Sequence, residues 1–175
     1  MFVRYNDIMS DNLRELVFTP IGVIRSPHKQ AVGTPIQATY GREAEGEVVV
    51  DERFTAALDD IEGFERIWLV YYLDRAGPFR LKVVPYRDTE QRGLFATRAP
   101  SRPNPVGLSV VRLLARERNV LRVRELDILD CTPLLDIKPY VPEFDAHPGS
   151  RAGWLDKRRE RRQQADGRFH EEGEQ

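Results

Sequence analysis

The chain has 175 residues, of which 31% are charged, and its formal net charge is −1. That length suits one domain with a sizeable core, and the balanced charge gives no overall basic field for nucleic acid, although a local patch remains open. A single cysteine, Cys131, excludes an intrachain disulfide framework and a cysteine-based metal cluster. No stretch approaches the roughly 18 apolar residues that span a bilayer, and the first residues contain no secretory apolar core. We therefore expect a soluble, cytoplasmic protein without membrane contact.

Short strands dominate the predicted elements. After a polar, flexible lead-in over residues 1–14, apolar or alternating segments recur between turn signals, which is typical of strands. Pro20 confines the first of them to a sheet edge or a bulge, and Arg118-Asn119 is typical of a hairpin turn. The segment at 66–73 (RIWLVYYL) is apolar enough for burial on both faces. The predicted strands are 16–24, 47–51, 66–73, 79–86, 94–97, 108–115 and 120–128.

Two segments favour helix. Residues 52–61 (ERFTAALDDI) form the one convincing internal helix, which Gly63 would end. Residues 154–164 (WLDKRRERRQQ) predict a basic helix, and the acidic end of the chain predicts disorder. We therefore expect a mainly β fold, a single-sheeted antiparallel barrel of about seven strands over residues 15–145. A basic helical and partly disordered tail follows over 146–175. No GxGxxG follows a strand, so a Rossmann-type site is not indicated.

Two proline-rich polar segments, 99–107 and 130–140, carry the candidate chemistry. Proline restricts the backbone, so each segment is expected to hold polar side chains in fixed positions around a small ligand. In the first, Arg98 and Arg102 either bind a carboxylate or phosphate or hold the loop's own carbonyl groups. Asn104 lies between two prolines and offers both a donor and an acceptor to a substrate amide or a base edge.

The second segment follows an apolar strand, where the ligand pockets of barrels open. Asp130 and Thr132 either bind a ligand there or form a turn before Pro133, and the spacing slightly favours the turn. Asp136 and Lys138 are expected to form an ion pair.

Other catalytic centres lack support in the sequence. The three histidines show no metal-ligand spacing, and neither a Ser-His-Asp order nor HExxH occurs, so we expect no metal site. Asp130 beside Cys131 disfavours a thiolate nucleophile. The basic run at 157–162 is either a solvated face or a phosphate-binding surface.

Four segments of the chain resemble one known family. They are IGVIRSPHK (21–29), GFERIWLVYYL (63–73), FATRAPSRPNPVGLSVV (95–111) and DILDCTPLLDIKPYVP (127–142). In this order they resemble the TrmO family, also called YaeB-like or TsaA-like, and the similarity covers roughly residues 15–145. RPNPVGLS and TPLLDIKPY are the most specific parts.

The resemblance implies a homodimeric β-barrel methyltransferase that uses S-adenosylmethionine. Its implied substrate is tRNA, in which it would methylate N6 of the threonylcarbamoyl-adenosine on the 3′ side of the anticodon. Carried over residue by residue, the implied cofactor pocket comprises Pro35, Ile36, Gln37, Asp74, Arg75, Arg98, Leu108, Asp130, Cys131, Thr132 and Pro133.

Two positions depart from the family pattern. Relatives carry His-Gln or His-Glu where this chain has Asp74-Arg75, and glycine where it has Cys131. Because glycine adopts positive φ readily and cysteine does not, either the turn is not left-handed here or Cys131 is strained.

Methyl transfer requires mainly that the enzyme aligns its reactants. The catalytic candidates are Asn104, to orient the N6 amino group, Arg102, to support the base together with Ser101, and Tyr140, which with Asp136 is a reserve proton acceptor. The expected phosphate contacts are Arg158, Arg159, Arg161 and Arg162. Two alternatives remain open: a methyltransferase acting on another RNA or a small molecule, and a non-catalytic barrel that binds nucleotides or RNA.

Overall fold

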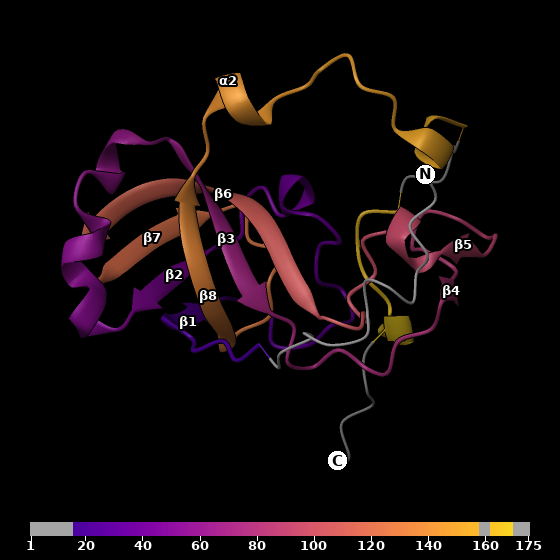
Figure 1. Cartoon of the computed structure of the whole chain (residues 1–175), viewed down its shortest axis with the longest axis horizontal. Helices are drawn as coiled ribbons and strands as arrows, with labels where there is room; N and C mark the ends of the chain where they lie inside the picture. The colour runs from indigo at the N-terminus through magenta and orange to yellow at the C-terminus, as the bar shows by residue number, and fades with distance from the viewer. Residues whose placement is uncertain (1–15, 158–161, 170–175) are drawn as a thin grey trace, which may run out of the picture.

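A closed six-stranded barrel forms the body of the protein (Figure 1). The computed structural model describes residues 16–157 and 162–169. All neighbouring strands of the barrel are antiparallel, and the last strand pairs with the first to close it. In spatial order the strands are β1 (Gly22–Arg25), β2 (Glu45–Val50), β7 (Val120–Arg124), β6 (Val106–Glu117), β3 (Arg66–Tyr72) and β8 (Thr132–Pro139). The predicted mainly β barrel is confirmed, with six strands in place of about seven.

The core is formed by side chains that point inward at every second position along the strands. On β3, Ile67 and Leu69 are fully buried, whereas the intervening Trp68 and Val70 are only half-buried. The prediction that this strand is buried on both faces was therefore wrong, because a barrel strand turns only one face inward. The other fully buried side chains come from the remaining barrel strands and from the segment that follows β7: Ile24, Val48, Val50, Val111, Leu121, Val123, Leu126, Ile128 and Leu134.

Strand β8 occupies most of the segment that was expected to be a proline-braced loop. Pro133 lies opposite Val23 of β1, and Pro139 lies opposite Ile67 of β3. At each of these positions the register pairs β8 with one neighbour only, so a missing N–H is tolerated. The prolines that suggested a loop therefore mark the two ends of the strand that closes the barrel.

Several predicted elements take other forms. The expected helix at 52–61 is a 3-10 helix, η2 (Glu52–Leu58), and a left-handed Asp60 (φ 66°) separates it from η3 (Ile61–Gly63). The expected strand at 94–97 is the 3-10 turn η4 (Leu94–Ala96). Of the expected strand at 79–86, only β4 (Lys82–Val83) is extended, and it pairs with β5 (Arg92–Gly93) outside the barrel. The hairpin turn at Arg118-Asn119 is confirmed, because Glu117 of β6 pairs with Val120 of β7.

The end of the chain returns to the barrel. After α2 (Pro142–Asp145), the described part of the expected basic helix begins with the 3-10 helix η5 (Gly153–Lys157), and residues 158–161 lie outside the described residues. Residues 162–164 are not helical: Gln164 forms a β-bridge with Pro35, which follows β1 in the sequence. The last described element is η6 (Gly167–Phe169), which packs near β4 and β5 (Figure 1). The lead-in 1–14 lies outside the described residues.

The described helices are all short. Within residues 16–157 and 162–169, none is long and apolar enough to cross a membrane. The division of the chain into lead-in, barrel and tail stays a prediction.

Candidate functional site

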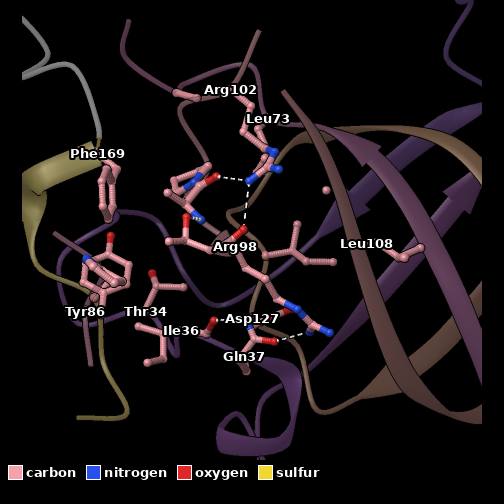
Figure 2. Close-up of a pocket in the computed structure, with 18 of the residues that line it drawn as sticks. Thr34, Ile36, Gln37, Leu73, Tyr86, Arg98, Arg102, Leu108, Asp127 and Phe169 are labelled. Carbon is pink, nitrogen blue, oxygen red and sulfur yellow. Dashed lines mark hydrogen bonds between the residues drawn. The ribbon is translucent and has the colours of Figure 1, made fainter. Parts of the chain in front are cut away.

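A cavity of about 760 Å³ opens where the β1–β2 connection, the 94–102 loop and the end of the chain meet the barrel (Figure 2). Nine of the residues that sequence reasoning proposed for the site line it. They come from segments far apart in the chain: Pro35, Ile36, Gln37, Asp74, Arg75, Arg98, Arg102, Leu108 and Thr132. The fold thus gathers most of the expected pocket around one space.

Arg98 and Gln37 meet across this cavity. The Arg98 guanidinium donates to Gln37 Oε1 at 2.5 Å, and both side chains come from loops rather than strands. Arg102 points back into its own loop, donating to the carbonyl oxygens of Thr97 at 3.0 Å and Ala99 at 3.4 Å. The carbonyl-holding interpretation is therefore confirmed for Arg102, while its side chain still lines the cavity (Figure 2).

Asp74-Arg75, the first departure from the family pattern, connects two parts of the expected pocket. Arg75 donates to Thr132 Oγ1 at 2.9 Å and also contacts the carboxylate of Asp74 at 3.3 Å. Thr132 in turn donates to the carbonyl oxygen of Leu129 at 2.7 Å. Arg75 thereby links the end of β3 to the start of β8.

Asp130, Cys131 and Pro133 do not line the cavity. Asp130 accepts from Lys29 Nζ at 2.6 Å and from the Ser26 backbone amide at 2.9 Å. These two hydrogen bonds, of which the one from Lys29 has the larger effect, lower the carboxyl pKa of Asp130 well below its usual range. Cys131 has φ 62°, so the left-handed alternative is correct and the cysteine is strained. Its exposed Sγ accepts from Arg25 at 2.8 Å.

The remaining catalytic candidates lie elsewhere. Asn104 is exposed, and its backbone carbonyl accepts from the Val106 amide at 2.8 Å. Tyr140 packs its ring 6.0 Å from that of Trp68, outside the cavity lining. Asp136 forms the expected ion pair with Lys138 at 2.9 Å. Of the three catalytic candidates, only Arg102 therefore lines the cavity.

Sequence reasoning missed a buried polar chain on the barrel wall of this cavity. Ser109 Oγ donates to Asp127 Oδ1 at 2.7 Å, and it lies 3.0 Å from the hydroxyl of Tyr71. Since the one Ser109 proton goes to the carboxylate, Tyr71 must be the donor to Ser109. Asp127 and Tyr71 both line the cavity.

Burial shifts the pKa values of both titratable groups in this hydrogen-bonded series of side chains. It raises the pKa of Asp127 to about 6, and the hydrogen bond from Ser109 counteracts part of the effect. It also raises the pKa of Tyr71, so that hydroxyl stays protonated and can donate. A carboxyl group with a pKa of about 6 is suited to taking up and releasing protons near neutral pH.

A glycine makes room for the polar chain. A Cβ built on Gly107 would lie 2.1 Å from Cε2 of Tyr71, so only glycine lets that ring pack against β6. Gly107 and Ser109 both belong to the RPNPVGLS motif, and Asp127 begins DILDCTP. The available sequence signal was a carboxylate among apolar residues, at position 127 near the end of the predicted strand 120–128.

The end of the chain builds one wall of the cavity. We call residues 162–169 the C-terminal strap. The strap forms three backbone hydrogen bonds with the loop after β1: Gly33 N to Ala165 O (2.9 Å), Ile36 N to Gln163 O (2.9 Å) and Ala165 N to Thr34 O (2.8 Å). The strap therefore holds the loop that carries Ile36 and Gln37, and its Ala165 and Phe169 line the cavity.

Phe169 anchors the strap in a small second core. Its side chain is buried with those of Val83, Leu94 and Ala99, and its ring stands edge-on to Tyr86 at 5.1 Å. Its carbonyl oxygen accepts from the buried Ser101 hydroxyl at 2.9 Å. Ser101 thus fixes the strap to the first proline-rich loop.

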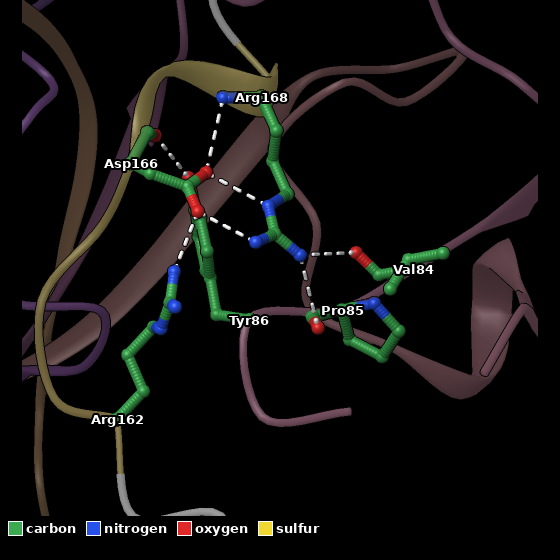
Figure 3. A network of polar contacts seen from close by, with 6 residues as sticks. All are labelled: Val84, Pro85, Tyr86, Arg162, Asp166 and Arg168. Atoms are coloured by element: carbon green, nitrogen blue, oxygen red, sulfur yellow. Dashed lines mark hydrogen bonds and ion pairs between the residues drawn. The ribbon is translucent and has the colours of Figure 1, made fainter. Parts of the chain in front are cut away.

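Asp166 is the centre of a second anchor (Figure 3). Arg162 and Arg168 each contact its carboxylate at 2.6 Å, and the hydrogen bond from Arg168 is the main cause of its lowered pKa. Arg168 also donates to the backbone carbonyls of Val84 and Pro85. Arg162, expected to contact phosphate, is therefore engaged within the strap. Arg158, Arg159 and Arg161 lie outside the described residues.

Among residues 16–157 and 162–169, no group of three or more His, Cys, Asp or Glu side chains is placed to hold a metal ion.

Comparison with known proteins identifies relatives of the barrel. A family model described as tRNA-methyltransferase O N-terminal domain matches residues 23–146. The chain is 52% identical over 156 residues to a probable S-adenosyl-L-methionine-binding protein of Pyrococcus abyssi, covering 88% of this chain and 85% of that protein. It is 35% identical over 147 residues to the tRNA (adenine(37)-N6)-methyltransferase of Escherichia coli, covering 78% of this chain and 63% of that protein.

A solved structure shares the fold. The crystal structure of TrmO from Pseudomonas aeruginosa superposes with a TM-score of 0.69 at 36% identity, covering 81% of this chain and 63% of that one. The chain thus spans somewhat less than two thirds of that protein.

Proposed function

Because the chain belongs to the tRNA-methyltransferase O family, we propose that it is an S-adenosylmethionine-dependent methyltransferase that methylates N6 of threonylcarbamoyl-adenosine beside the anticodon of tRNA. One observation carries the proposal beyond family membership. Eight of the eleven residues that the family pattern assigns to the cofactor line one cavity, although they are spread along the sequence from Pro35 to Thr132.

The chemistry of the cavity suits an amino-acid nucleoside. Its volume lies in the range of small-molecule and cofactor sites. The carboxylate of Asp74 can face the positive groups of S-adenosylmethionine, and the guanidinium groups of Arg75 and Arg98 can face its carboxylate. When bound, this cofactor supplies a methyl group attached to a positively charged sulfur.

The cofactor residues divide into two sets. Those that line the cavity would contact the cofactor: Pro35, Ile36, Gln37, Asp74, Arg75, Arg98, Leu108 and Thr132. Asp130, Cys131 and Pro133 would act from behind, by fixing the turn from which Thr132 enters β8. We assign to Arg102 the role of fixing the 97–102 loop, which presents Arg98. Asn104 and Tyr140 remain candidates only for contacts with bound tRNA at the rim.

The tRNA substrate is supported by the family relationship and by the basic run. The assignment of phosphate contacts to Arg158, Arg159, Arg161 and Arg162 stays a prediction. Arg162 would have to exchange its partner Asp166 for a phosphate. A tRNA substrate also implies a cytoplasmic location.

An exposed apolar patch favours a homodimer. Tyr72 and Val106, which pair across β3 and β6, are 44% and 41% exposed, and the neighbouring Leu108 is 55% exposed. Contiguous apolar surface of this kind commonly marks a protein interface. Sedimentation of the wild type and of Tyr72→Glu tests it, since loss of the dimer in the variant is expected.

Transfer of labelled methyl groups to tRNA tests the proposed activity. Incorporation into tRNA that carries the threonylcarbamoyl group, but not into tRNA lacking it, is expected. Equal incorporation into both would favour a methyltransferase with another target. Calorimetry that detects binding of ATP but not of S-adenosylmethionine would favour a non-catalytic nucleotide-binding barrel.

A further inference from the structure

Asp127 is unusual for a charged residue, because the protein encloses it while it still faces the cavity. It is half-buried, lines the cavity and lies three residues after the end of β7 (Figure 2). Its carboxylate accepts from Ser109 Oγ at 2.7 Å, and the nearby backbone amides of Ala38 and of Asp127 itself also favour its charged form. A carboxylate offers about four acceptor positions, so room is left for a further donor from the cavity.

The groups around Asp127 do not neutralise it. Among the described residues, Arg98 on the 94–102 loop is the cation whose charge lowers the pKa of Asp127, and the Arg98 guanidinium is hydrogen-bonded to Gln37. From β3 it faces the Tyr71 hydroxyl, which stays neutral because burial raises its pKa. From β6 it faces only the neutral Ser109. Within residues 16–157 and 162–169, Asp127 therefore has a donor that orients it but no salt-bridge partner.

A purely structural role explains this arrangement poorly. An asparagine could accept the Ser109 hydrogen bond without the cost of enclosing a charge. A carboxylate kept in such a place, beside a ligand-sized cavity and oriented by a Tyr71–Ser109 chain, fits a group that must take up a proton.

We propose that Asp127 is the proton acceptor for methyl transfer, taking the hydrogen from N6 of the target adenosine as the new carbon–nitrogen bond forms. This inference rests on the proposed function. The N6–H electron pair forms the bond to the methyl carbon, and the carbon–sulfur electron pair stays on sulfur, which becomes neutral. The proton ends on Asp127 and leaves to solvent through the cavity. The positive charge of the sulfonium and the negative charge of the carboxylate are thus both removed, and no other reactant is needed.

Asp127→Asn tests this assignment, with Asp59→Asn as the matched control. Asp59 pairs with Arg116 outside the cavity lining. Single-turnover methylation of threonylcarbamoylated tRNA should slow by about 10² to 10⁴-fold in Asp127→Asn, which is the usual contribution of a general base. Calorimetric affinities for S-adenosylhomocysteine and for tRNA should stay within about threefold, because a base acts on the rate and not on ground-state binding.

A pH profile separates a base from a merely structural residue. The wild-type rate should rise through the pKa of Asp127 near pH 6. Ser109→Ala removes a hydrogen bond that favours the ionised form of Asp127, so the rise of the methylation rate should move to higher pH in this variant. In Asp127→Asn the rise of the rate near pH 6 should disappear. Direct titration of the Asp127 carboxyl by carbon NMR should follow the same shift in the protein without ligand.

Three results would overturn the proposal. They are a wild-type rate in Asp127→Asn, a loss of S-adenosylhomocysteine affinity of tenfold or more in that variant, and a profile unchanged by Ser109→Ala. If the wild type itself methylates no tRNA while it binds S-adenosylhomocysteine, the proposed function is wrong and the role of Asp127 falls with it. If the wild type is active and Asp127→Asn is equally active, only the role of Asp127 is wrong.

Discussion

Asp127→Asn should make the folded protein more stable at neutral pH, with an effect that grows as pH rises. Burial raises the pKa of this carboxyl from 3.8 to about 6, so folding works against its ionisation. Each tenfold change in acid strength corresponds to about 1.36 kcal/mol, so the charged form costs about 3 kcal/mol above pH 6. Between the two pKa values the unfolded chain binds fewer protons than the folded one, and wild-type stability therefore falls as pH rises.

Urea unfolding of both proteins at several pH values measures this effect. The difference in free energy of unfolding, variant minus wild type, should grow by about 2 kcal/mol from pH 4 to pH 7, because part of the cost is already present at pH 4. In Tm this is about 4–8 °C for a chain of this size. A pH-independent difference would show that the Asp127 carboxylate ionises as freely as an exposed one and would refute the reasoning.

Asp130→Asn provides a control of opposite sign three residues away. Lys29 and the Ser26 amide lower the pKa of Asp130, so its charged form stabilises the fold above the unfolded pKa of 3.8. This stability is lost as pH falls through the lower, folded pKa. The substitution should therefore destabilise the protein at neutral pH and have less effect in acid.

Three further substitutions probe the construction of the site. Gly107→Ala forces a Cβ to within 2.1 Å of the Tyr71 ring and should lower the free energy of unfolding by about 1–3 kcal/mol in urea, whereas Gly93→Ala, which meets nothing within 4 Å, should change it little. Cys131→Gly relieves a left-handed φ of 62° and should raise thermal stability by about 0.5–1 kcal/mol, since about 1–2 kcal/mol of strain exceeds the entropic cost of glycine; a lower Tm would contradict this. Phe169→Ala should detach the strap, weakening calorimetric S-adenosylhomocysteine affinity about tenfold and speeding hydrogen exchange at the Gly33 and Ile36 amides, while barrel amides stay protected. Phe144→Ala, at a 70% exposed position outside the cavity, should leave both readouts unchanged.

The strands of the barrel could be read from local pattern. Apolar segments between turn signals marked most of the barrel strands, and Arg118-Asn119 supplies the turn between β6 and β7, whereas the inward face of the 66–73 segment was not predicted. Such signals are local, because side-chain period and turn chemistry depend on neighbours in the sequence. The motif around Arg98 likewise located one side of the cavity, and the family resemblance located most of the others.

Elements whose form depends on distant partners were predicted less well. The 52–61 segment has helical composition, but it becomes 3-10 turns broken at Asp60. The TPLLDIKP segment contains two prolines that indicate a loop. It is nevertheless a strand, because its first residues pair with β1 and its later residues pair with β3. Neither neighbour is close in sequence, so no local pattern could reveal the pairing.

By itself the sequence determined the barrel class, the family and nine of the side chains that line the cavity, because the hydrophobic period, the turns and the motifs depend on residues that are neighbours in the sequence. Only the tertiary structure decided that Asp127 meets Ser109 and Tyr71 beside that cavity and that the strap closes its wall. The burial that raises the pKa of Asp127 is a property of the closed barrel, since it arises from atoms contributed by several strands and loops at once.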